Sequence, residues 1–211
     1  MRTVSGVGVL DKAVWVLDAL DGGPMSLAEL VNATGLSRPT AHRLAQALEV
    51  HGFVGRDGGG RFCLGPRLAT AGLAALARPA MERLREATGE SVQLYVRRGE
   101  HRVCVAALES PHGLRTIVEV GASLPLDRGS AGRALAAGPR RPGHPGWAES
   151  VEERQRGVAS VSAPVTDAQG RTVAAVSVSG PLERTTRRPG ARYGAAVVEA
   201  AGAISEALAR G

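Results

Sequence analysis

Apolar positions in the first third of the chain recur at the spacing of a helix. Over residues 9–20, Leu10, Val14 and Leu17 lie three or four positions apart and so share one helix face. We expect this face to point inward. The Gly-Gly-Pro run at 22–24 would end the helix. A first core helix is therefore predicted over 9–20.

Two further helices are predicted after this break, and Gly35 separates them. Ser26 can cap the first of them with its hydroxyl, while the Glu29 carboxylate reaches back to the cap amide. Gly35 can adopt the left-handed conformation that ends a helix. Ser37 can open the next helix, with Pro39 tolerated in its first turn. The apolar face of this last helix carries Ala41, Leu44, Ala45 and Leu48.

The opposite face of the last helix is polar. Its side chains offer donors and acceptors that suit base edges and phosphates in the major groove of DNA. The pattern therefore indicates a helix-turn-helix, and the predicted DNA contacts of its second helix are Ser37, Arg38, Pro39, Thr40, His42, Arg43 and Gln46. An ordinary pair of helices with a solvated face would show the same spacing.

A hairpin is predicted directly after these helices. Val54 and Phe62 lie on either side of a turn at 57–60. Beside a recognition helix, such a hairpin would be a wing that places Arg56 and Arg61 on the phosphate backbone or in the minor groove. For each arginine alone, a solvated surface charge is the alternative.

The second part of the chain begins with helices and then changes to alternating apolar positions. Residues 67–77 predict a connecting helix, and Pro79 begins another helix that Gly89 ends. The predicted strands are 92–98, 102–109, 115–120, 157–165 and 172–180, with helices at 129–137 and 192–210 and a loop at 139–146. This order predicts an α+β domain with an antiparallel sheet.

Composition limits the class of protein. The chain is 44% hydrophobic and 22% charged, which is normal for a soluble protein. No apolar run approaches the ~20 residues of a membrane helix, and no secretory cleavage site is visible. We therefore expect a cytoplasmic protein without a membrane partner. Cys63 and Cys104 lack metal-ligand or disulfide spacing and are expected to be buried thiols, so no metal or cofactor is predicted.

The net charge of +6 does not come from the predicted DNA-binding part. Residues 1–66 hold six basic and six acidic side chains, so the excess lies after residue 66. Binding to DNA must therefore depend on where the basic side chains lie rather than on the overall charge.

Five stretches resemble the IclR-type transcriptional regulators. They are GLSRPTAHRL, GRFCLGPRL, GSAGRAL, GVASVSAPV and AAVSVSGP. Each alone is a weak signal, whereas all five in this order are specific. The stretches GVGVLDKA, TGESVQLY and VAAVSVSGP look closest to an actinomycete branch that controls amino-acid biosynthesis, leucine in particular.

The resemblance implies an α+β chain with an N-terminal winged helix-turn-helix, a linker helix and a C-terminal GAF-like antiparallel sheet with flanking helices. The implied boundaries are 1–66 for the DNA-binding domain, 67–78 for the linker helix and 79–211 for the effector-binding and oligomerisation domain. Such regulators are homodimers on double-stranded operator DNA and often dimers of dimers.

The resemblance also implies a site for a small carboxylate metabolite at one end of the sheet. Ser130 and Ala131 begin the helix of GSAGRAL, where backbone amides and the helix dipole favour an anion. Alternation places Ser177 and Ser179 on one strand face, so both hydroxyls can reach one ligand. The full implied set is Leu124, Ser130, Ala131, Val158, Ser160, Ser177 and Ser179. Small polar residues that merely fill a packed strand are the alternative.

One segment departs from the family pattern. Family members have a longer helical segment between GSAGRAL and GVASV than this chain has. An acidic ligand contact expected in this region would fall near Ser150, beside Glu149 and Glu152. We therefore expect a pocket that is more open or that takes a different effector.

Two other functional classes compete with a ligand-responsive regulator of metabolic, above all amino-acid, genes. An enzyme is disfavoured because no GxSxG, P-loop, HExxH or paired zinc motif is present, and no catalytic residue is predicted. A ligand-independent architectural DNA-binding protein would use its second domain for oligomerisation alone.

Overall fold

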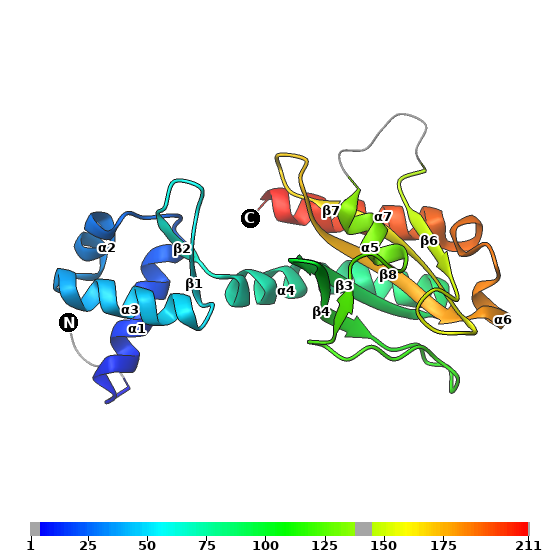
Figure 1. The fold of residues 1–211 in the computed structure, drawn as a ribbon, viewed down its shortest axis with the longest axis horizontal. Coiled ribbons are helices and arrows are strands. Elements are labelled where there is room, and N and C mark those ends of the chain that lie inside the picture. Colours follow the sequence, from blue (N-terminus) through cyan, green and yellow to red (C-terminus); the bar gives the residue numbers. More distant parts are fainter. Residues whose placement is uncertain (1–4, 138–144, 211) are drawn as a thin grey trace. The chain divides into compact units, whose positions relative to one another are not determined.

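The computed structural model describes residues 5–137 and 145–210. The chain divides into two units, Met1–Gly72 and Leu73–Gly211, each with a hydrophobic core of its own (Figure 1). The predicted loop at 139–146 lies almost entirely outside the described residues. In the described ranges, no helix is both long and apolar enough to cross a bilayer.

The first unit is a three-helix core followed by a hairpin. Its core consists of buried apolar side chains from every element, among them Val16, Leu20, Leu30, Ala41, Ala45, Val54 and Phe62. The elements are α1 (Gly8–Asp21), α2 (Leu27–Thr34), α3 (Arg38–Val50), β1 (Val54–Arg56) and β2 (Phe62–Leu64). The mixed α+β fold class, with this unit preceding a sheet domain, is confirmed.

Local sequence signals set the turn between α2 and α3. The Ser26 hydroxyl accepts a hydrogen bond from the Glu29 amide at 3.3 Å, and the Glu29 carboxylate accepts one from the Ser26 amide at 2.7 Å. Gly35 follows α2 with φ of 66°, the left-handed conformation that favours glycine. The predicted capping box and glycine turn are confirmed. Ser37 precedes α3 as predicted, but its hydroxyl bonds to the Thr40 hydroxyl at 2.8 Å rather than to a backbone amide.

The prediction for the inward face of α1 is wrong for two of its three residues, since only Leu17 is partly buried and packs against the core. Leu10 is 54% and Val14 is 44% exposed, whereas Val16 and Leu20 are buried in the core. The helix carries apolar side chains on more than one face, so periodicity alone could not say which face meets α2 and α3. An apolar stripe of α1 consequently lies on the surface of this unit.

The hairpin predicted over 54–64 is present. β1 and β2 pair antiparallel, and Met25 exchanges two backbone hydrogen bonds of 2.8 Å with Phe62. At the turn, the Asp57 carboxylate accepts hydrogen bonds from the amides of Gly59 and Arg61, both at 2.9 Å. The carboxylate thus supplies the hydrogen-bond acceptors that these turn amides do not receive from a neighbouring strand.

The second unit is built on one antiparallel sheet. Its six strands run in the order β5-β4-β3-β8-β7-β6. They are β3 (Ser91–Arg98), β4 (His101–Leu108), β5 (Ser123–Pro125), β6 (Ala148–Val151), β7 (Val158–Thr166) and β8 (Thr172–Pro181). The helices are α4 (Pro66–Thr88), which crosses the division of the chain, α5 (Ser130–Ala136), α6 (Leu182–Thr185) and α7 (Pro189–Arg210).

Helices cover both faces of this sheet (Figure 1). Alternate residues of each strand face opposite sides. On one face, apolar side chains such as Leu94, Val161 and Val176 pack against Met81 of α4 and Val197 of α7. On the other face, Tyr95, Ala175 and the α5 alanines form a smaller cluster. The serines of β7 and β8 lie on this second face.

The structure corrects two predicted elements. Pro79 lies inside α4 and does not begin a new helix. A proline removes one helix hydrogen bond, but Ala77, Ala80 and Met81 are all buried against the sheet, and this continuous packing maintains the helix. Residues 115–120 form no strand, because the neighbouring β4 pairs with β5 at 123–125 instead.

Sequence reasoning did not predict β6. The strand is short and lacks apolar alternation. Its position is set by Trp147, whose ring lies where a Cβ on Gly190 or Gly194 of α7 would stand. Two glycines one helical turn apart therefore make room for the ring. This spacing could not be interpreted from the sequence, because nothing in it shows that α7 packs against Trp147.

Candidate functional sites

Most predicted DNA contacts lie together on α3 and at its start, whereas Arg56 and Arg61 lie on the hairpin. Arg38, Pro39, Arg43 and Gln46 are exposed, and so is Ser37 at the helix start. Thr40 and His42 are half-buried, because they lie at the edge of the face that packs on the core. The opposite face holds Ala41 and Ala45, both fully buried. One helix thus presents a polar surface of the size and chemistry of a major-groove reader.

The basic side chains of this unit differ in whether acids neutralise them. Arg56 pairs with Glu49 at 3.1 Å, and Arg61 pairs with Asp57 at 2.9 Å. Exposed ion pairs of this kind are weak, so both arginines can exchange their carboxylate for a phosphate. Arg38 and Arg43 form no ion pair with any residue that the structure describes.

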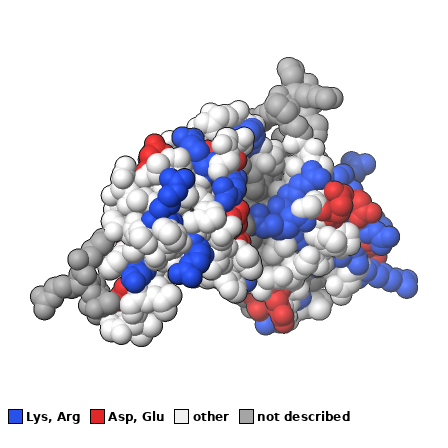
Figure 2. All heavy atoms as spheres, turned by 60° about the vertical axis from the view of Figure 1, so that its left-hand side comes forward, with Lys and Arg blue, Asp and Glu red and all other residues white. Residues whose placement is uncertain are grey.

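The surface visible in Figure 2 carries charges of both signs. Figure 2 shows basic side chains interspersed with uncharged residues and with some acidic ones. Residues 1–66 are neutral overall. Arg38 and Arg43 on α3 are therefore available to DNA without breaking an ion pair, whereas Arg56 and Arg61 of the hairpin must first leave their carboxylates.

A second candidate site lies in the second unit, where α5 meets the serine-bearing face of the sheet. A cavity of about 30 Å³ is found there. We call it the serine cavity, and its lining consists of Gln93, Tyr95, Arg102, Gly129, Ser130, Ala131, Ser150, Arg154, Val158, Ser160, Ser177 and Ser179. Its lining is thus polar, with hydroxyls and two guanidiniums and no acidic side chain.

Hydroxyl groups at the cavity are joined by hydrogen bonds across strands. Ser160 lies opposite Ser179, and Ser162 lies opposite Ser177 in the register of β7 and β8. Ser130 bonds to the hydroxyls of Ser160 and Ser162, both at 2.7 Å, and Ser162 donates to Ser177 at 2.9 Å. These groups can reorient toward a ligand oxygen because a hydroxyl both donates and accepts.

Arginines and a tyrosine occupy another part of the lining. The guanidinium of Arg102 stands 5.6 Å from the centre of the Tyr95 ring. Burial raises the pKa of Tyr95 to about 12, although the positive charges of Arg154 and Arg102 act in the opposite direction. Tyr95 therefore keeps its proton at neutral pH and remains a hydrogen-bond donor.

The acids near the cavity are engaged elsewhere. Ser150, not an acid, occupies the lining position where an acidic contact was expected. The Glu149 carboxylate accepts from the Gly190 amide at 2.8 Å, and Glu152 accepts from the Gly157 amide at 2.9 Å. Glu153 pairs with Arg133 at 2.7 Å and accepts from the Gly129 amide at 2.9 Å.

Most residues of the implied effector set line one cavity. Ser130, Ala131, Val158, Ser160, Ser177 and Ser179 do so. Leu124 does not line it; it lies on β5, where it packs against the cluster around Tyr95 and Cys104. The sequence reasoning missed the lining residues Gln93, Tyr95, Arg102 and Arg154, and also Ser162, which does not line the cavity but bonds to Ser130. Alternation with Ser160 could have suggested Ser162, whereas the others are brought in by strand order.

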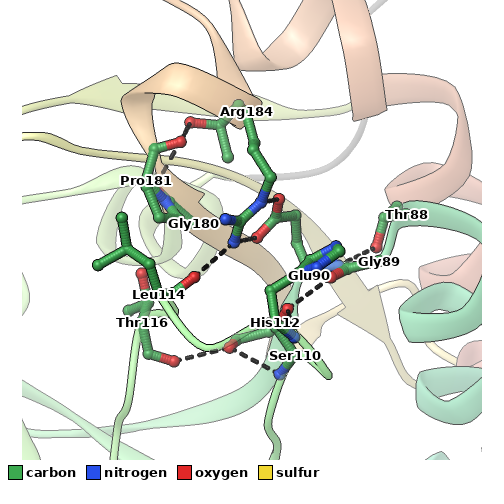
Figure 3. A network of polar contacts seen from close by, with 12 residues as sticks. Thr88, Gly89, Glu90, Ser110, His112, Leu114, Thr116, Gly180, Pro181 and Arg184 are labelled. Atoms are coloured by element: carbon green, nitrogen blue, oxygen red, sulfur yellow. Dashed lines mark hydrogen bonds and ion pairs between the residues drawn. The ribbon is translucent and has the colours of Figure 1, made fainter.

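A buried polar network lies where β3 begins and β8 ends (Figure 3). Glu90 follows the end of α4, and its side chain is 2% exposed. Arg184 of α6 donates to both of its carboxylate oxygens, at 2.6 and 3.0 Å, and to the Leu114 carbonyl at 2.7 Å. This pair therefore joins the end of α4 to the segment that follows Ser177 and Ser179.

Two family patterns match the chain. The IclR helix-turn-helix domain matches residues 9–58. The bacterial transcriptional regulator IclR C-terminal domain matches residues 67–142 and 140–206, in two overlapping pieces. Together they span both units.

Individual relatives agree with these matches. The glycerol operon regulatory protein of Streptomyces coelicolor is 30% identical, over 96% of this chain and 96% of its own length. The transcriptional repressor IclR of Escherichia coli is 25% identical, over 89% of this chain and 83% of its own. A solved IclR-family regulator from Rhodococcus has a TM-score of 0.58 at 28% identity and covers all of this chain and 98% of its own. The chain therefore belongs to the IclR family of DNA-binding transcriptional regulators.

Proposed function

We propose that this protein is a ligand-responsive regulator whose α3 reads operator DNA and whose serine cavity binds a small carboxylate metabolite. The observation that carries the proposal is the exposed polar face of α3, with Arg38 and Arg43 unpaired among the described residues. A guanidinium without a protein partner can donate to guanine or phosphate without breaking an existing ion pair. The remaining contacts are assigned to Ser37, Pro39, Thr40, His42 and Gln46, with the wing residues Arg56 and Arg61 on phosphates.

Recovery of bound DNA tests the DNA-reading role. The purified full chain is mixed with sheared genomic DNA, and the retained fragments are sequenced. We expect enrichment of an inverted repeat whose half-sites lie about one helical turn apart, because a two-fold dimer places its recognition helices in successive major grooves. Recovery of no common sequence would contradict the proposal.

The pathway under control is inferred from the relatives and the sequence resemblance. The names of the relatives include a glycerol operon regulator, which supports control of metabolic genes. Control of amino-acid genes stays a prediction from the resemblance. From the proposed DNA binding we infer a cytoplasmic protein. The family consists of transcription regulators rather than enzymes.

We assign the apolar stripe of α1 to contact with a second copy of the chain. Leu10 and Val14 lie four positions apart on α1 and are 54% and 44% exposed, and Val7, which directly precedes the helix and lies three positions before Leu10, is 52% exposed. Exposed apolar stripes on a helix are typical of association surfaces. A pair of copies also supplies the second recognition helix that the proposed operator needs. Further assembly into a dimer of dimers stays a prediction.

Introducing charge into this stripe should weaken the dimer. In the double variant Leu10→Glu with Val14→Glu, two carboxylates would have to lose water on association, which is unfavourable without partners. We expect the dimer dissociation constant, measured by sedimentation equilibrium, to rise by at least about tenfold. Val50→Glu is the control, because Val50 is 84% exposed and lies outside the stripe. Equal dissociation constants for the double variant and the control would contradict the assignment.

Ser177→Ala should blunt the response to the effector but leave operator affinity unchanged. Ser177 lies in the serine cavity, away from the first unit in sequence. Loss of one hydrogen bond to a charged ligand typically weakens binding by about tenfold or more. The effector is identified first, by thermal denaturation of the wild type with a panel of short carboxylic acids. The acid that raises the melting temperature most is taken as the effector.

Operator binding is then measured against increasing concentration of that acid in wild type, Ser177→Ala and the control Ser123→Ala, an exposed serine of β5. An unchanged response in Ser177→Ala would remove Ser177 from the site. If no acid in the panel raises the melting temperature, the ligand-independent architectural role is favoured instead.

A further inference from the structure

Arg102 is a buried cation in the serine cavity without an acidic partner. It lies on β4, is 3% exposed and lines the cavity. One terminal nitrogen donates to the carbonyl oxygens of Pro125 and Arg128, the latter at 2.6 Å. Its buried Nε donates to no described residue. A cation removed from water is strongly disfavoured unless an opposite charge or a full set of acceptors compensates.

A second guanidinium faces the same cavity. Arg154 lines it from the turn that follows β6, and its side chain is exposed. Burial lowers the pKa of Arg102, and the positive charge of Arg154 lowers it further, against the opposing effects of Tyr95, Asp127 and Glu153. Two like charges thus share one small space, an arrangement that an anion between them would stabilise.

Nearby carboxylates do not neutralise this pair. Glu153 is committed to Arg133 and to the Gly129 amide. Asp127 is exposed, and no ion pair joins it to Arg102 among the described residues. Ser150 stands where an acidic side chain was expected. The lining therefore carries two positive charges and no negative one.

A purely structural role for Arg102 explains only part of this arrangement. Its bonds to Pro125 and Arg128 hold the chain between β5 and α5. They do not explain the unpartnered Nε, nor why Arg154 faces the same cavity. Both observations are explained if an oxyanion lies against these two guanidiniums.

We propose that the effector is a dianion, with its second charged group bound by Arg102 and Arg154. The inference rests on the proposed effector role of the serine cavity. The cavity is small, about 30 Å³, so the charged group that enters it is a compact carboxylate or phosphate on a short chain. Both oxyanions accept parallel hydrogen bonds from a guanidinium. A short dicarboxylate and a phosphate monoester are the two sources of this chemistry.

Calorimetric titration of the full chain with three probes tests the inference. The probes are malonate, methyl phosphate and propionate, which resembles malonate in length but carries one charge. At about pH 8 methyl phosphate carries two charges, because its second pKa is about 6. We expect malonate or methyl phosphate to bind at least about tenfold more tightly than propionate. Whichever dianion binds more tightly identifies the source.

Arg154→Gln is the decisive variant, because an exposed side chain can be replaced without disturbing the fold. It should reduce dianion affinity to that of propionate and leave propionate binding unchanged. Arg156→Gln, an exposed arginine of the same turn outside the cavity, should keep the preference. Equal affinity of all three probes for the wild type, or an unchanged preference in Arg154→Gln, would overturn the dianion and leave the effector role standing.

Binding of none of the three probes would also overturn the dianion. The effector role itself then depends on the wider acid panel and on the recovery of DNA, which use different readouts.

Discussion

Replacing Arg184 with alanine should destabilise the second unit by about 3 kcal/mol. The change leaves the Glu90 carboxylate, 2% exposed, without its counter-charge and with both hydrogen bonds to it broken. A buried charge that loses its partner typically costs more than the pair contributes. The free energy of unfolding is measured by urea denaturation, followed by circular dichroism of the full chain.

Two further variants make this prediction specific. Arg188→Ala removes an exposed arginine of the same segment and should change the free energy of unfolding by less than about 0.5 kcal/mol. Adding Glu90→Gln to Arg184→Ala removes the stranded charge and should restore part of the lost stability. If Arg184→Ala is as stable as Arg188→Ala, the Glu90–Arg184 pair drawn in Figure 3 does not stabilise the second unit.

The double variant Arg38→Ala with Arg43→Ala should bind operator at least about 30-fold more weakly, because each arginine contact with DNA is worth about 1–3 kcal/mol. These two arginines have no ion pairs with described residues, so their loss leaves no compensating charge on α3. Operator affinity is measured by fluorescence anisotropy with a labelled duplex. If the two side chains contact phosphates, the salt dependence of binding should also fall.

The matched control for this variant removes the same amount of charge elsewhere. Arg171→Ala with Arg210→Ala deletes two exposed arginines of the second unit. This control should keep operator affinity within about threefold, since neither arginine belongs to the DNA-binding unit and exposed charges outside the contact surface are largely screened at physiological salt. Equal loss in both double variants would mean that net charge, not the placement on α3, determines binding.

Short-range signals made the first unit predictable. The capping box at Ser26 and the left-handed Gly35 act within a few residues, and the hairpin follows from its turn. The inward face of α1 was not predictable in the same way. Leu10 and Val14 are as apolar as Val16 and Leu20, and only contact with α2 and α3 determines which pair is buried.

Long-range packing limited the prediction of the second unit. Pro79 is a strong local signal for a helix start, yet buried residues on both sides of it keep α4 continuous. The alternation at 115–120 is typical of a strand, but no neighbouring strand pairs with it. The position of Trp147 against Gly190 and Gly194 depends on residues more than forty positions away.

The candidate effector site was likewise predictable from short-range signals only in part. The alternation of the strand predicted that Ser177 and Ser179 share one face, and the motif resemblance predicted Ser130 and Ser160 as parts of the same site. All four residues line the cavity. Arg102 and Arg154 come from β4 and from the turn after β6, so only the strand order brings them to it. The two positive charges change the proposed ligand from an acid with one charge to a dianion.

Sequence-specific DNA binding by a chain whose residues 1–66 carry no net charge is the central claim. The most direct test is the ratio of the affinities of the full protein for the recovered operator and for a scrambled duplex of equal length at physiological salt. Specific regulators bind their sites about 10³-fold or more above random DNA, and we predict a ratio of at least that order. A ratio near one would contradict the account.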